Sequence, residues 1–393
     1  MANIVYFLGA GASAQAIPTV ADSMCRFEIF SIFLNAKATS AVFESDDTES
    51  KVKAKLSEYE TLLHACQEHL SFDTLAKKLY LQQEYPKLHS LKEFLSLYYI
   101  FEHYTSQDFV TVIDEYRSQL EYRTELEIDE LAEKALRFHL NPIDFRYDAF
   151  IAGISDNQLI HRLFIPKNVS IISWNYDLQM EFALNEYDRF ESRRLDFMFN
   201  PIDYKNSVIK FEFSNEYIKL NGCAGYILEN NKSLQRTELE INSKLEILEM
   251  PLDHGEDIFD FLFDTIERFV KNRNINEFRP YINFAWEDNE LSNCTVGRAK
   301  SKIDAADSIV VIGYSFPTFN REVDAHLFSN IELGRGCKIY IQAVNENEFS
   351  KVKTRIQGIA NSLNDSDFEF IDDVSQFYVP FEFSKQVSKP YAS

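Results

Sequence analysis

The stretch from Tyr6 to Thr19, YFLGAGASAQAIPT, joins an apolar strand to a glycine-rich turn and constrains the fold more than any other part of the chain. Because glycine has no Cβ, the backbone N–H groups of Gly9 to Ser13 can approach a pyrophosphate closely. The helix predicted after them would add its unpaired N–H groups and its positive dipole end. The third glycine of the full G-x-G-x-x-G pattern is missing. A tight strand-to-helix turn without a ligand is therefore the open alternative to a nucleotide site.

Five further apolar runs have the length and composition of buried strands, and they cover residues 169–173, 216–220, 308–312, 338–344 and 368–371. Segments with apolar residues at helical spacing separate them. Short buried strands alternating with helices predict an α/β fold, a Rossmann-like, mostly parallel sheet flanked by helices. We expect one domain over residues 1–393, with helical insertions at about 30–140 and 237–300.

Composition narrows the class of protein. The formal charge of −22, from 40 basic and 62 acidic residues, disfavours direct binding to nucleic acid, because the chain would repel a phosphate backbone. The five cysteines are scattered without zinc spacing, so we expect neither a metal site nor a disulfide framework. No run approaches the roughly 18 apolar residues of a membrane span, and the N-terminus lacks a signal-peptide pattern. We expect a cytoplasmic protein with no membrane association.

Small or amide-bearing residues follow four of the predicted strands. The four loops are Gly9–Ser13, Trp174–Asp177, Gly313–Pro317 and Asn345–Asn347. In an open α/β sheet, ligands bind beyond the carboxyl ends of the strands, so these loops should meet at one crevice. For Asn175 and Asp177 a plain turn is the alternative, because Asn and Asp often bond their own backbone after a strand.

An ordered set of motifs extends this pattern. Its members are Gly9–Ser13 with Ile17–Thr19, Phe72–Asp73, Ile172–Asp177, Lys219–Gly222, Val311–Pro317 and Val344–Asn345. Together they resemble the sirtuin-like (Sir2-type) superfamily, and more narrowly the NAD hydrolases of that type in bacterial antiphage defence. No single motif is specific, whereas the ordered set is. The resemblance implies an α/β catalytic domain with NAD as its substrate.

The resemblance also implies a role for each matching residue. Four residues would line the pyrophosphate: Gly9, Ala10, Gly11 and Ser13. Pro18 and Thr19 would belong to a mobile loop that closes over the nicotinamide ribose. Gly313 and Ser315 would contact the phosphates and the adenosine ribose, and Asn345 would contact that ribose as well.

At the reacting end, Asn175 and Asp177 match the family's Asn-x-Asp pair, the aspartate to hold the carboxamide and the asparagine to position a water or the ribose. Nicotinamide leaves as a neutral group, so cleavage needs an oriented water and a nearby carboxylate rather than a strong acid. Asn221 stands where deacylating sirtuins have a histidine, and an amide cannot take a proton from a ribose hydroxyl. Protein deacylation is therefore disfavoured, and Asn221 is a third catalytic candidate that would orient water.

Four other residues have weaker claims to the site. His139 and His161 lie near candidate segments only in sequence, so surface or core positions are favoured for both. Arg146 has the geometry to bind phosphate, but an ion pair with a neighbouring aspartate is favoured. For Trp174, stacking on the nicotinamide ring and packing as a core indole are equally good interpretations.

These inferences predict an NAD hydrolase that releases nicotinamide and ADP-ribose and so depletes NAD in antiphage defence. Such an enzyme has to be held inactive before infection, so we expect a regulatory partner or an assembly switch. Relatives of this layout are similar to subunits paired with a HerA-like hexameric ATPase, which also implies a homo-oligomer. The alternative is a non-catalytic module that binds NAD or ADP-ribose as a sensor in a defence complex, favoured by the loss of the histidine base at Asn221.

Overall fold

The computed structural model describes residues 2–69, 71–104, 143–155, 165–187, 200–203, 208–210, 216–230, 243–247, 258–271, 278–331, 336–360 and 362–383. Its main sheet has eight strands in the order β11-β10-β9-β1-β2-β5-β4-β3. The first six are parallel: β1 (Ile4–Leu8), β2 (Val169–Ser173), β5 (Glu216–Lys219), β9 (Ser308–Ile312), β10 (Lys338–Gln342) and β11 (Phe368–Ile371). The strands β3 (Asn200–Asp203) and β4 (Val208–Lys210) continue the sheet in antiparallel pairing.

This sheet confirms the predicted α/β, Rossmann-like fold. The strands β2, β9 and β11 have the predicted bounds, while β5 ends one residue and β10 two residues before the predicted end. Every residue of β1, β2 and β9 is buried. Burial on both faces explains why these strands read as continuous apolar runs rather than as alternating patterns.

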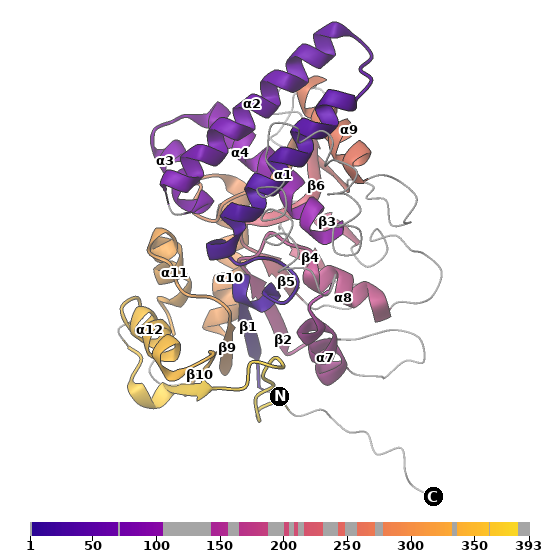
Figure 1. Cartoon of the computed structure of the whole chain (residues 1–393). Coiled ribbons are helices and arrows are strands. Elements are labelled where there is room, and N and C mark those ends of the chain that lie inside the picture. The colour runs from indigo at the N-terminus through magenta and orange to yellow at the C-terminus, as the bar shows by residue number, and fades with distance from the viewer. Residues whose placement is uncertain are drawn as a thin grey trace, which may run out of the picture.

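Helices cover both faces of the sheet (Figure 1). On β1, Ile4, Tyr6 and Leu8 belong to one apolar cluster, which includes residues of α7 (Phe145–Ile154) and α8 (Gln179–Tyr187). The alternate residues Val5 and Phe7 belong to a second cluster. The helices that contribute to this second cluster are α10 (Glu290–Asp304), α11 (Arg321–Phe328) and α12 (Glu346–Gln357). Alternate side chains of a strand point to opposite faces, so the two clusters lie on either side of the sheet.

A helical block lies beyond the carboxyl ends of the strands (Figure 1). It contains α1 (Val20–Ser40), α2 (Asp46–Glu68), α3 (Phe72–Leu81) and α4 (Tyr85–Tyr104). The helical insertion predicted at about 30–140 is helical as far as residue 104, and residues 105–142 lie outside the described ranges. Within the described helices, none combines the length and apolar character that crossing a bilayer requires.

The predicted insertion at 237–300 is only partly helical. A second, antiparallel sheet has the order β7-β6-β8, formed by β6 (Gly222–Asn230), β7 (Ser243–Ile247) and β8 (Phe278–Ile282). Two of its strands lie in the predicted helical range, where α9 (Ile258–Lys271) and the start of α10 are the helices. The prediction of helix was wrong for β7 and β8, because their sequences, SKLEI and FRPYI, are not the continuous apolar runs by which the buried strands were recognised.

Candidate functional site

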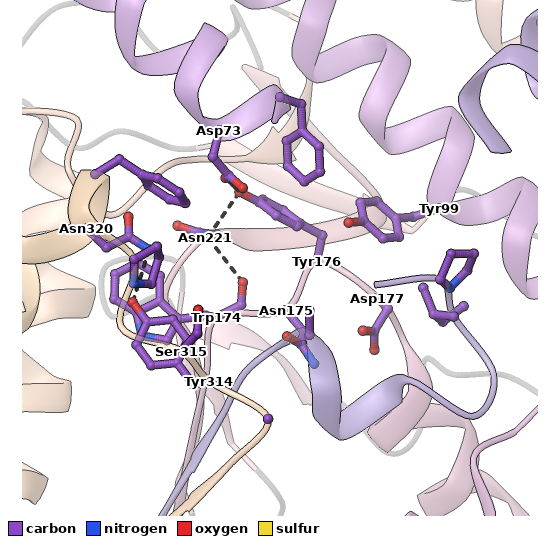
Figure 2. Close-up of a pocket in the computed structure, with 17 residues that line it drawn as sticks. Asp73, Tyr99, Trp174, Asn175, Tyr176, Asp177, Asn221, Tyr314, Ser315 and Asn320 are labelled. Carbon is purple, nitrogen blue, oxygen red and sulfur yellow. Dashed lines mark hydrogen bonds between the residues drawn. The ribbon is translucent and has the colours of Figure 1, made fainter. Parts of the chain in front are cut away.

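Four adjacent strands, β9, β1, β2 and β5, have their carboxyl ends beneath the helical block. From β1 the chain continues to β2 and β5 on one side, and later returns to β9 and β10 on the other side of β1. Such a reversal of strand order opens a crevice at the strand ends, which is where α/β proteins bind ligands. A pocket of about 110 Å³ lies there (Figure 2). A single water needs only roughly 10–15 Å³, so the space suits part of a larger ligand.

The structure brings three of the four predicted loops to this pocket. Seven of the predicted site residues line it: Ala10, Pro18, Asn175, Asp177, Asn221, Gly313 and Ser315. The other five do not line it: Gly9, Gly11, Ser13, Thr19 and Asn345. Asn345 is exposed and caps α12, where its Oδ1 accepts a hydrogen bond from the Glu348 N–H at 2.9 Å. The fourth loop therefore lies outside the pocket.

The glycine-rich turn packs directly on the loop after β9. The Gly9 N–H donates to the Ile312 carbonyl at 3.0 Å, and the Gly11 N–H donates to the Gly313 carbonyl at 3.0 Å. A Cβ on Gly9 would lie 2.6 Å from the Tyr314 Cα. These glycines thus allow two loops to touch, and their N–H groups are already bonded within the protein. Among the predicted phosphate-binding residues of this turn, Ala10 is the one that faces the pocket.

Ser13 is bonded to Asn175, the first residue of the Asn-x-Asp pair. Its hydroxyl accepts from the Asn175 Nδ2 at 3.2 Å. The Tyr147 hydroxyl, 3.1 Å from the Ser13 Oγ, completes the cluster. Ser13 is 1% exposed, so its position is set by packing as well as by these bonds. It orients Asn175 from outside the pocket.

Arg146 forms hydrogen bonds to the glycine-rich turn. Its guanidinium makes a two-point ion pair with Asp144, at 2.9 Å from Nε to Oδ1 and 2.6 Å from Nη2 to Oδ2. The Nη2 atom also donates to the carbonyls of Gly11 at 3.0 Å and Ala12 at 3.2 Å. The ion-pair interpretation of Arg146 is confirmed, and its charge stabilises carbonyl groups of the glycine-rich turn.

A buried charged cluster supports the loop after β2. The Lys219 ammonium pairs with Glu181 Oε1 at 2.9 Å and donates to the Asp177 carbonyl. Burial raises the pKa of Asp177, while Lys219, the Gln179 N–H and Ser13 act in the opposite direction. Burial alone would lower the pKa of Lys219, but its acidic neighbours outweigh burial and raise it. Lys219 therefore stays charged and anchors the backbone of the Asn-x-Asp pair.

Asn221 is held by the protein at both ends of its amide. Its Nδ2 donates to the Trp174 carbonyl at 3.1 Å and to the Tyr176 hydroxyl at 3.1 Å (Figure 2). Its Oδ1 accepts from the Ala285 N–H at 3.1 Å. The Ala285 bond fixes which end of the amide is the oxygen. Asn221 thus ties β5, the loop after β2 and the loop after β8 together at the edge of the pocket.

Replacing Asn221 with alanine is expected to lower the free energy of unfolding by about 2–4 kcal/mol, because the buried Ala285 N–H and Trp174 carbonyl each lose a partner. Chemical denaturation followed by circular dichroism measures this change through the midpoint. The control is Asn330→Ala, an exposed amide whose loss should cost less than about 0.5 kcal/mol. Equal midpoints for the two variants would show that the Asn221 bonds do not hold the site.

The pocket also contains residues to which the sequence assigned no role. Asp73 of α3 and Tyr99 of α4 line the side under the helical block, and Asn320 lines the side after β9. Trp174 stacks on Tyr314 with ring centroids 5.3 Å apart and planes 4° apart. The Phe72–Asp73 motif was part of the resemblance, but the helical periodicity around it indicates only a core face.

A histidine at the pocket could supply the base that is missing at Asn221. No histidine lines the pocket in the described part of the chain. His103 of α4 is buried nearby, and burial lowers its pKa to about 3, so it is neutral and accepts from the Leu178 N–H at 2.8 Å. His139 and His161 lie outside the described residues. The described part of the chain contains no group of three or more acidic, histidine or cysteine side chains placed to hold a metal ion.

Comparison of the sequence with protein-family models and with curated proteins gives no match to either.

Proposed function

We propose that this chain is an NAD hydrolase that cleaves the bond between nicotinamide and ribose, releasing nicotinamide and ADP-ribose. The observation that carries the proposal is the meeting of Asn175 and Asp177 with the glycine-rich turn and the Gly313–Ser315 loop in one pocket. A strand-end crevice of this kind is where a dinucleotide binds in α/β proteins. The ordered motifs of the sirtuin-like resemblance support the choice of NAD as substrate.

The residues present fit a hydrolytic reaction. The oxocarbenium-like state carries developing positive charge on the ribose, which a nearby carboxylate such as Asp177 stabilises. Asn175 is bonded on one side to Ser13, which orients its amide toward water or the ribose. Trp174 and Tyr314 form a stacked aromatic wall against which a planar ring can pack and water is excluded.

The biological setting follows from the same resemblance. An enzyme that removes NAD suits abortive infection, in which an infected bacterial cell stops phage growth by exhausting a central metabolite. We propose that the chain acts in the cytoplasm as a homo-oligomer, with a HerA-like hexameric ATPase as its regulatory partner. The net charge of −22 suits docking on a basic surface of such a partner.

The second candidate function is a non-catalytic NAD or ADP-ribose sensor in a defence complex. It is favoured by the amide at position 221, whose nitrogen and oxygen are both bonded within the protein. In that case, binding of the dinucleotide would be reported to the partner without turnover.

Nicotinamide release from NAD by the purified chain, alone and mixed with the partner ATPase, tests the first function. We expect turnover, and we expect Asn175→Ala to lower kcat by about 10²–10³-fold, the usual effect of removing one oriented polar group. The control is Asn330→Ala, an exposed asparagine outside the pocket, which should keep wild-type turnover. Measurable NAD binding without nicotinamide release under both conditions would favour the sensor, and full activity of Asn175→Ala would overturn the site assignment.

A further inference from the structure

Asp73 places a second carboxylate in the pocket, on the side opposite the Asn-x-Asp pair. It lies in the first turn of α3, where the Ser71 Oγ caps the helix by accepting from the Thr74 N–H at 3.2 Å. Asp73 is 6% exposed and lines the pocket. A carboxylate is seldom buried so completely without a partner, so its contacts indicate what it does.

A chain of hydrogen bonds with a fixed direction reaches Asp73. The Tyr176 hydroxyl donates to Asp73 Oδ1 at 2.8 Å and accepts from the Asn221 Nδ2 at 3.1 Å (Figure 2). Because the amide nitrogen can only donate, the single proton of the hydroxyl points to Asp73. Asn221, through its bonds to Trp174 and Ala285, keeps this chain in place.

The second carboxylate oxygen of Asp73 has no hydrogen bond to any described residue, and it is not among the fully enclosed polar atoms that lack a partner. It is therefore left to the pocket. Burial raises the pKa of Asp73 to about 7, and the bond from Tyr176 acts in the opposite direction. The group is thus close to half ionised at neutral pH, where a carboxylate can both take up and release a proton.

The titratable groups around Asp73 come from α2, α4 and the loops after β2 and β9. They are Tyr176, Tyr99 of α4, Cys66 of α2 and Tyr314. Burial raises the pKa of all four, so each is neutral at physiological pH. The other pocket carboxylate, Asp177, already accepts from the Gln179 N–H at 3.0 Å, and the neighbouring Lys219 lowers its pKa against the effect of burial.

We infer that Asp73 is the proton acceptor of the site, with Tyr176 and Asn221 as its positioning residues, and that it takes the role of the histidine that deacylating sirtuins have at the position of Asn221. This inference rests on the proposed NAD hydrolysis. In the step, the oxygen of water forms a bond to the ribose C1′ while the bond from C1′ to the nicotinamide nitrogen breaks, its electron pair leaving with nicotinamide. One proton of the water passes to Asp73 Oδ2, and Asp73 then releases that proton to solvent.

The pH dependence of kcat/KM for NAD tests this inference. Activity of the wild-type chain should rise with pH through an apparent pKa near 7, as ionised Asp73 becomes available. Asp73→Asn should lower the rate by about 10²–10⁴-fold and remove this rise, the acid limb of the pH profile. The affinity for NAD should stay within about threefold of the wild-type value. Asp73→Glu should restore part of the rate together with an acid limb.

Tyr176→Phe is the variant that separates a chemical role from a structural one. The bond from Tyr176 lowers the pKa of Asp73, so its loss should move the acid limb to higher pH, with thermal denaturation confirming that the variant folds. If the wild-type chain turns over NAD and Asp73→Asn keeps the full rate, the assignment of Asp73 is overturned while the proposed hydrolysis stands. The same holds if the acid limb of the pH profile does not move in Tyr176→Phe. Absence of nicotinamide release by the wild-type chain, with and without its partner, would overturn the proposed hydrolysis and this inference together.

Discussion

Replacing Gly313 with alanine is expected to destabilise the protein by about 2–4 kcal/mol and to abolish the proposed NAD turnover. Gly313 has a φ of +64°, and a Cβ there would lie 2.5 Å from the Gly11 Cα. The left-handed backbone costs an alanine about 1 kcal/mol, and overpacking adds about 1–3 kcal/mol or more. Because the neighbouring atoms are backbone, they cannot move aside without separating the two loops. Thermal and chemical denaturation measure the first effect, and nicotinamide release measures the second.

Gly336→Ala is the matched control for this prediction. Gly336 has nearly the same φ, +66°, but a Cβ there would meet no atom within 4 Å. It should therefore show the backbone cost of about 1 kcal/mol alone and keep full activity. If both variants lose the same stability, the close contact between the glycine-rich turn and the loop after β9 contributes nothing measurable.

Lys219→Met is expected to lower the free energy of unfolding by about 3–5 kcal/mol, because it leaves Glu181 as a buried charge without its partner. The Lys219 and Glu181 side chains are 3% and 0% exposed. The substitution also removes the donor to the Asp177 carbonyl, so NAD turnover should fall as the Asn-x-Asp pair loses its anchor. Urea denaturation at neutral pH measures the loss of stability.

The loss in Lys219→Met should depend on pH in a predictable direction. Burial raises the pKa of Glu181, and removal of Lys219 raises it further. A carboxyl whose folded pKa lies above its unfolded value favours folding below the unfolded pKa of about 4.3, and this contribution disappears as pH rises through the folded pKa. The loss of stability in Lys219→Met should therefore be smallest at acidic pH. The double variant Lys219→Met/Glu181→Leu should regain most of the stability, and Lys53→Met, which breaks an exposed pair with Glu49, should cost less than about 1 kcal/mol.

The parallel sheet was predictable from the sequence because its strands are buried on both faces. Continuous apolar runs such as those of β2 and β9 identify such strands without reference to any partner. The rule that ligands bind at strand ends then placed Asn175, Asp177 and Gly313 near one another. The strands β7 and β8 escaped prediction, because their sequences, SKLEI and FRPYI, mix polar and apolar residues and contain no such run.

The chemical detail of the pocket depends on partners that no local pattern reveals. The bond between Tyr176 and Asp73 joins positions 103 residues apart, and the periodicity of α3 marks Asp73 only as an inward-facing position. The glycine-rich motif has a similar limit. Its sequence shows that N–H groups can come close to a ligand, but not that those of Gly9 and Gly11 are already bonded to the loop after β9.

The position of β1 in the sheet also sets the order of events during folding. Its Ile4 pairs with Val169 on one side and with Ser308 on the other, so the strand at the centre of the sheet has neither neighbour nearby in sequence. At roughly 5–20 residues per second on the ribosome, about 15–60 s separate the synthesis of β1 from that of β9. Throughout that interval an apolar strand has an unpaired edge, which makes the nascent chain prone to aggregation. We expect co-expression with chaperones to raise the yield of folded protein more than lowering the expression level does.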